Sequence, residues 1–182
     1  MSKRQESDEY WVINLLENIF REHASRQHRF PFLLGDVGKN GRRVSLPVDA
    51  YFAQANVAVE FAEKQHSQSI AHFDKPDKMT ISGVHRGEQR KLYDIRKVQT
   101  LKKEGIPLLV VSHSEFQCKT DGRLVRDLHA DNAVLVKRVA ALAEERKRVG
   151  HRISWGDPSR FAASVAQIEV LGPVKRTIVS GA

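Results

Sequence analysis

The hydrophobic positions near the start of the chain repeat at helical spacing. In order, they are Trp11, Val12, Leu15, Leu16, Ile19 and Phe20. Ser7 precedes them as an N-cap, and Asp8 and Glu9 stand in the first turn, where acidic side chains favour the positive end of the helix dipole. This pattern predicts a helix over residues 8–24.

Shorter apolar runs follow, separated by residues that favour turns. An apolar run over residues 30–34 leads to a Gly- and Asn-rich turn over 35–41, and a β-like run follows over 43–52. A Val- and Ala-rich run over 56–61 comes after only a few residues. The spacing predicts a hairpin that a third strand extends into a meander.

The middle of the chain changes from a polar stretch to a helical pattern. Residues 67–87 show no sustained period, and a loop of this length in a compact domain is usually functional or mobile. A second helix is then predicted up to Gly105 at its C-cap. Its apolar face would consist of Leu92, Ile95, Val98 and Leu101. The run IPLLVVS over 106–112 is typical of a strand buried on both faces.

The remainder of the chain predicts helices. A helix over residues 132–148 ends in a basic cluster. Its apolar side would consist of Leu135, Val139 and Leu142. Asp157 and Pro158 then form an N-cap and a first-turn proline, which predict a short C-terminal helix.

Length and composition fit one folded α/β domain. The 182 residues are 41% hydrophobic and 29% charged, which excludes the low-hydrophobicity signature of disorder. This length hardly accommodates two full domains. We expect a core over residues 1–130, with a C-terminal helical extension over 131–182 packed on it.

The charge balance favours a polyanionic partner. The formal net charge is +8, from 30 Lys and Arg against 22 Asp and Glu. Cys118 is the single cysteine, so a disulfide framework and a Cys-rich zinc site are excluded. The N-terminal residues lack the apolar core of a signal peptide, and no stretch approaches the roughly 20 apolar residues of a spanning helix. We expect a soluble, cytoplasmic protein without membrane partners.

One acidic pair carries the candidate chemistry. Asp49 stands in one predicted strand and Glu60 in the next, so antiparallel pairing would bring the two carboxylates together. Mg²⁺ is bound by one or two carboxylates, waters and substrate phosphates, so this pair beside a basic surface suits phosphodiester hydrolysis. The alternative is a pair of solvated carboxylates at strand ends.

The order of these elements resembles a known nuclease superfamily. The string VEFAEKQH, which contains Glu60, resembles the pattern IExDGxQH, and YDIRKVQTLKKEGIPLLVV resembles an Asp-x-x-Arg/Lys helix followed by a glycine turn and a core strand. Both patterns occur in the branch of the PD-(D/E)XK superfamily that includes very-short-patch mismatch-repair endonucleases and related restriction and homing endonucleases. The resemblance spans residues 8–112.

The resemblance implies a restriction-endonuclease-like α/β core, a mixed central sheet flanked by helices. It implies Asp49 and Glu60 as ligands of Mg²⁺, for which Mn²⁺ would substitute, and Gln65 and His66 as polar groups of the active site. The expected activity is metal-dependent endonucleolytic hydrolysis of DNA, chiefly duplex DNA, in restriction, repair or homing. Many relatives are dimers, so a homodimer is also compatible with this resemblance.

The sequence departs from the superfamily at one position. A lysine commonly stands two residues after the glutamate, where it stabilises developing negative charge, but this chain has Ala62 there. Lys64 on the same strand face, Lys97 from the following helix, and His66 as a general base are three alternatives. Asp94, one turn before Lys97, is either a site residue or part of a surface ion pair with it.

Candidate nucleic-acid contacts lie in the long loop and at the start of the following helix. They are Lys75, Lys78, Arg86, Arg90 and Lys91. A solvated loop is the alternative interpretation of this region. The missing lysine also leaves open a second function, a non-catalytic nucleic-acid-binding module on a nuclease-like fold.

Overall fold

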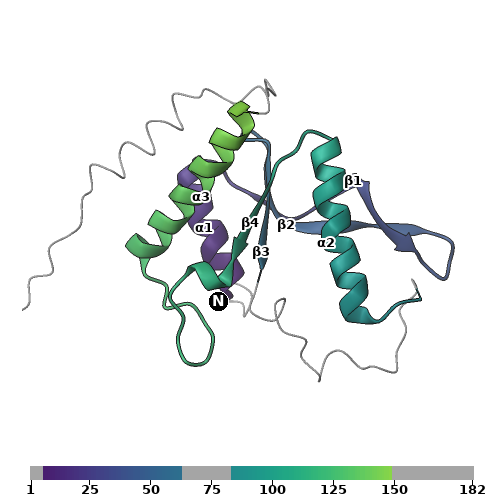
Figure 1. Ribbon diagram of the computed structural model, residues 1–182, viewed down its shortest axis with the longest axis horizontal. Helices are drawn as coiled ribbons and strands as arrows, with labels where there is room; N and C mark the ends of the chain where they lie inside the picture. The colour runs from purple at the N-terminus through teal and green to yellow at the C-terminus, as the bar shows by residue number, and fades with distance from the viewer. Residues whose placement is uncertain (1–5, 63–82, 149–182) are drawn as a thin grey trace, which may run out of the picture.

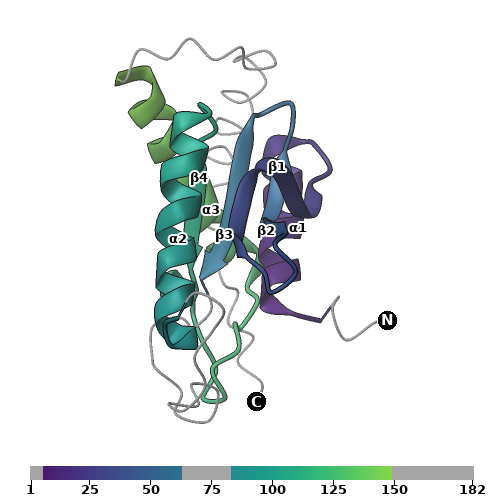
Figure 2. The same cartoon turned by 90° about the vertical axis from the view of Figure 1, so that its right-hand side faces the viewer.

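The computed structural model describes residues 6–62 and 83–148, which form an α/β unit with helices on both faces of one sheet (Figure 1). In chain order the elements are α1 (Asp8–Phe20), β1 (Ser25–Val37), β2 (Arg43–Phe52), β3 (Val57–Ala62), α2 (Arg86–Lys103), β4 (Leu108–Ser112), the 3-10 helix η2 (His113–Glu115) and α3 (Leu128–Arg148). Figure 2 shows α2 on one side of the sheet and α1 on the other. The expected mixed sheet flanked by helices is confirmed.

The four described strands lie in the order β1, β2, β3, β4. β1 pairs antiparallel with β2, β2 pairs antiparallel with β3, and β3 pairs parallel with β4. The predicted meander is therefore confirmed, with β1 beginning at Ser25, earlier than the apolar run suggested. The parallel pairing of β3 and β4 follows from the crossover through α2, because only a long connection brings a parallel strand alongside.

The first helix starts where the sequence predicts it and ends earlier. The Ser7 hydroxyl accepts a hydrogen bond from the Tyr10 N–H at 3.1 Å, as an N-cap does. Arg21 adopts a left-handed conformation with φ of 52°, which terminates the helix after Phe20. The prediction of a helix to residue 24 was therefore wrong at its end.

The larger core lies between the sheet and the layer formed by α1 and α3. Val12 and Leu16 of α1, Leu135 of α3, and Phe52 and Val59 of the sheet are fully or almost fully buried in it. The predicted apolar side of the last described helix is confirmed, since Leu135 and Val139 are buried and Leu142 packs against the same cluster.

The α2 side of the sheet has a smaller core, and here one prediction was wrong. Leu101 is fully buried, but Leu92, Ile95 and Val98 are 43%, 53% and 49% exposed. The helix instead directs a more polar row toward the sheet. Because Lys97 and Leu101 in this row are four residues apart, they lie on one helix face, and the row of Leu92, Ile95 and Val98 lies beside it.

The strand predicted to be buried on both faces lies at an edge. β4 pairs with β3, and no other strand in the described part of the chain pairs with it. Leu109 and Val111 are buried, whereas Val110 is 40% exposed. The prediction of burial on both faces was therefore wrong for this strand. Alternate side chains face opposite sides of the sheet, and only one of these sides is fully packed.

The proposed division at residue 130 falls inside α3, whose first residue is Leu128. The helix begins four residues before the predicted start, and its buried apolar side chains, Leu135 and Val139, belong to the same core as α1. The short helix predicted after Asp157 lies outside the described residues, so the extension as a whole stays a prediction.

Candidate active site

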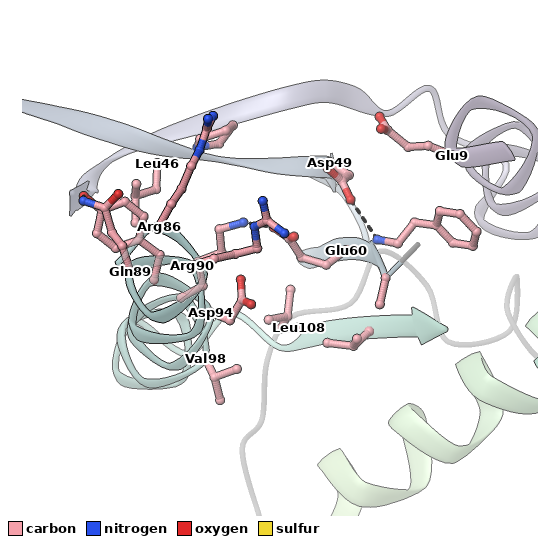
Figure 3. A pocket seen from close by; sticks show the side chains of 16 residues that line it. Glu9, Leu46, Asp49, Glu60, Arg86, Gln89, Arg90, Asp94, Val98 and Leu108 are labelled. Atoms are coloured by element: carbon pink, nitrogen blue, oxygen red, sulfur yellow. Dashed lines mark hydrogen bonds and ion pairs between the residues drawn. The ribbon is translucent and has the colours of Figure 1, made fainter. Parts of the chain in front are cut away.

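A pocket of about 590 Å³ lies between α2 and the sheet, and both predicted metal ligands line it (Figure 3). β2 contributes Asp49, β3 contributes Glu60, and α2 contributes a row of polar side chains. From α2 these are Arg86, Gln89, Arg90, Tyr93, Asp94 and Lys97. Glu9 of α1 also lines the pocket, and apolar groups such as Leu46 and Leu108 complete its walls. Charged groups from four elements therefore meet in a partly apolar pocket.

The strand register explains why the two acids converge. β2 and β3 are paired at Ala50 and Val59, and continuing this antiparallel register by one residue places Asp49 opposite Glu60. Residues directly opposite each other in antiparallel strands direct their side chains to the same face. The expectation that the two carboxylates share one side of the sheet therefore agrees with the structure.

Asp49 is held by hydrogen bonds from both neighbouring strands. Its Oδ2 accepts the Phe61 backbone N–H of β3 at 2.8 Å, and its Oδ1 accepts the Gln27 side-chain amide of β1 at 3.3 Å. The Gln27 amide also donates to Glu9 Oε1 of α1 at 3.1 Å. Asp49 is therefore fixed in orientation, and a carboxylate has acceptor capacity beyond these two bonds.

Gln27 makes these contacts from an unusual backbone conformation. Its φ of 50° lies in the left-handed region, and no other residue of β1 has a positive φ. Non-glycine residues in this region store on the order of 1–3 kcal/mol, and such strain is concentrated at functional sites. The strained residue is the one whose side chain joins Glu9 to Asp49.

Glu60 forms a largely buried ion pair with a lysine of the helix. Lys97 Nζ lies 2.7 Å from Glu60 Oε1, and the two side chains are 14% and 20% exposed. Burial raises the pKa of Glu60 from its ordinary value of 4.5 to about 7, because the carboxylate loses hydration. The Lys97 ammonium partly opposes this increase in pKa, whereas the negative charges of Asp49 and Asp94 add to it.

Of the three alternatives for the missing lysine, the structure describes Lys97 alone, and this residue reaches Glu60 from α2. Asp94 also lines the pocket. Lys97, the residue that the surface alternative paired with Asp94, pairs with Glu60 instead. Five other candidates lie outside the described residues: Lys64, Gln65, His66, Lys75 and Lys78.

The basic candidates of α2 divide into two groups. Arg86 and Arg90 line the pocket, whereas Lys91 is exposed and is not among its lining residues. Arg86 and Gly87, which the sequence assigned to a loop, form the first turn of α2. The pocket therefore combines two arginines near the start of the helix with the acidic groups beyond them.

Sequence reasoning missed Glu9, Gln27 and Tyr93. Glu9 was interpreted solely as a first-turn acid of a helix, and it lines the pocket near Asp49. Gln27 lies before the apolar run from which the first strand was predicted. Only Tyr93 had a local signal. It stands four residues before Lys97 on a predicted helix, so the two side chains share one helix face.

The donor set suits a cation such as Mg²⁺, which needs few protein ligands. It does not suit a metal ion that is coordinated entirely by protein side chains. Within residues 6–62 and 83–148 no group of three or more His, Cys, Asp or Glu side chains is arranged to hold a metal ion. Mg²⁺ needs fewer, since it keeps several waters and uses one or two carboxylates together with substrate phosphates. The fixed oxygens of Asp49 and the carboxylate of Glu60 meet that requirement.

Comparisons of the chain with protein-family models, with curated proteins and with solved structures find no match. Among the helices in the described ranges, none is long and apolar enough to cross a membrane.

Proposed function

We propose that the protein is a metal-dependent endonuclease that hydrolyses phosphodiester bonds in DNA, on a restriction-endonuclease-like fold. The observation that carries this proposal is the pocket itself, where Asp49 and Glu60 face α2 and Lys97 lies 2.7 Å from Glu60. Acidic metal ligands, a lysine and arginines around one cavity are the groups that phosphodiester hydrolysis requires.

Each described side chain has a defined role in this proposal. Asp49 and Glu60 would hold Mg²⁺ or Mn²⁺, which supplies positive charge that polarises a phosphoryl oxygen and helps to ionise a water. The Phe61 N–H and the Gln27 amide orient Asp49. Lys97 provides an ammonium group next to Glu60 and stabilises negative charge on the phosphate. It thereby replaces the superfamily's usual lysine, whose position is occupied by Ala62 in this chain.

The arginines of α2 bind the substrate backbone in this account. Arg86 and Arg90 line the same pocket from adjacent helical turns, so both guanidinium groups are available to phosphates that approach the acids. The formal charge of +8 strengthens attraction of a polyanion to the whole molecule.

Cleavage of supercoiled plasmid DNA by the purified full chain tests the proposal. We expect nicked or linear product with Mg²⁺ or Mn²⁺ and none with a chelator, and we expect Asp49→Asn to abolish it while the circular dichroism spectrum stays unchanged. Asp121→Asn is the matched control, because Asp121 is exposed and does not line the pocket. Cleavage by Asp49→Asn at the unmodified rate would refute the proposed site.

A second candidate function is a non-catalytic nucleic-acid-binding module. It is favoured by the Lys97–Glu60 ion pair, which neutralises Glu60 without a metal. This function predicts salt-sensitive DNA binding with no metal-dependent cleavage of plasmid or of linear DNA. It also predicts that Glu60→Gln leaves DNA binding unchanged, whereas the endonuclease proposal predicts that this substitution abolishes cleavage.

A further inference from the structure

The β1–β2 hairpin extends past α2 as a narrow two-stranded ribbon, which Figure 1 shows projecting to the right of the helix. We call residues 36–44 the arm. Val37 and Val44 on its two strands are 51% and 68% exposed, so the arm contributes little to either core. A ribbon with exposed apolar and cationic side chains at its end is available to contact a partner.

The arm is cationic in its exposed groups. Lys39, Arg42 and Arg43 are exposed, and the single acid of the arm, Asp36, forms an ion pair with Arg96 of α2 at 2.7 Å. The arm therefore presents a local excess of positive charge, which suits a polyanion.

The turn of the arm is ordered by its own hydrogen bonds. The Gly38 N–H donates to the Arg42 carbonyl at 2.7 Å, and the Gly41 N–H donates to the Gly38 carbonyl at 2.9 Å. Gly41 has φ of 72°, a conformation that glycine adopts without strain. A defined turn fixes the backbone at Lys39 and Arg42 relative to each other, which lowers the entropic cost of binding.

The base of the arm is fixed to the helix that carries Lys97. Arg96 pairs with Asp36 and donates to the Leu34 carbonyl at 3.2 Å, and the Asp36 N–H donates to the Tyr93 hydroxyl at 3.2 Å. The next residue, Lys97, pairs with Glu60 in the pocket. The helix therefore sets the position of the arm relative to the pocket.

We infer that the arm lies in a groove of duplex DNA and positions the duplex on the pocket, an inference that rests on the proposed function. Asp49 lies eight positions after Gly41 along the turn and β2, which corresponds to roughly 26 Å in extended conformation. That length is shorter than one turn of B-DNA, about 34 Å, and the major groove admits a two-stranded ribbon. The arm can thus occupy a groove while a phosphate of the same duplex reaches the pocket.

Binding measured without divalent metal tests this inference independently of cleavage. We compare Lys39→Ala/Arg42→Ala with the wild-type chain on a fluorescent 30-base-pair duplex and on the corresponding single strand, by anisotropy over a range of salt concentrations. Lys102→Ala/Lys103→Ala is the matched control, because it removes two exposed charges from the end of α2 opposite Arg86 and Arg90.

For the arm variant we expect the duplex Kd to rise by about tenfold or more and the slope of log Kd against log salt to fall by about two. The single-strand Kd should change much less, and the control variant should bind both ligands as the wild type does. An unchanged duplex Kd, or an equal loss on duplex and single strand, would overturn the inference. If the wild-type chain binds duplex through the arm but never cleaves it, the arm is supported and the endonuclease proposal fails.

Discussion

At the scale of single residues, the chemistry of the pocket depends on how Glu60 is held. Its carboxylate is mostly buried, faces the negative charge of Asp49, and is compensated by Lys97. Burial nevertheless dominates, so the pKa of Glu60 is raised to about 7. A carboxyl group with this pKa is partly protonated near neutral pH and must lose its proton to bind a metal ion. Metal binding at such a site is therefore coupled to proton release.

The raised pKa of Glu60 predicts that the unfolding free energy depends on pH, and that Glu60→Gln weakens this dependence. The folded chain keeps a proton on Glu60 between pH 4.5 and about 7 that the unfolded chain releases, so wild-type stability falls as pH rises through this window. The full shift corresponds to about 3 kcal/mol. Urea unfolding at pH 5 and pH 8 without divalent metal should show a smaller loss of unfolding free energy in Glu60→Gln. Identical losses in both proteins would contradict this assignment.

Substitution of Lys97 should lower the rate of cleavage without weakening metal binding. Lys97→Met keeps the length of the side chain and removes the ammonium group, so Glu60 is no longer paired and Mn²⁺ affinity should stay equal or increase. Cleavage should fall by about a hundredfold or more, the cost of removing one group that stabilises transition-state charge. Mn²⁺ titration and single-turnover cleavage measure the two effects. Loss of Mn²⁺ binding with Lys97→Met would show that this residue supports the fold of the pocket instead.

At the scale of elements, α2 connects the site to the rest of the fold. Arg86, Arg90 and Lys97 line the pocket, Arg96 fixes the base of the arm, and Leu101 enters the core. The side of the helix that faces the sheet is therefore mainly polar near its start and apolar at its end. The row of Leu92, Ile95 and Val98 lies to one side and is exposed.

This arrangement predicts unequal effects of two leucine substitutions on the same helix. Leu101→Ala removes a fully buried side chain and should lower the unfolding free energy by about 2–5 kcal/mol. Leu92→Ala, at a position that is 43% exposed, should change it by about 0.5 kcal/mol or less. Chemical denaturation of both variants measures the difference. Comparable destabilisation by Leu92→Ala would show that the exposed row packs in the folded protein.

The elements were predictable where local pattern decides them. The cap at Ser7, the three-strand meander and the glycine turn at Gly105 follow from residues near one another in sequence. The edge position of β4 did not follow, because an apolar run indicates that a strand is buried without indicating which strands lie beside it. The sheet-facing row of α2 was also missed, since apolar spacing identifies an apolar face but not the face that meets the sheet.

At the scale of the whole molecule, the candidate site brings together residues that are distant in sequence. Asp49 and Glu60 were predictable as a pair because one turn connects their strands. Glu9, which lines the pocket, and Gln27, which donates to Asp49, were not, since the packing of α1 and β1 brings them there. Lys97 was one of three alternatives in the sequence, and its contact with Glu60 became evident when α2 was placed against the sheet.

The proposed activity depends on one divalent cation that Asp49 and Glu60 share. Crystals of the full chain soaked in Mn²⁺, with anomalous diffraction measured at the manganese edge, test it directly. We expect a peak in contact with both carboxylates, and no peak there in Asp49→Asn crystals treated identically. A fully soaked wild-type crystal with no peak at the pocket, and with Lys97 still paired to Glu60, would contradict the account.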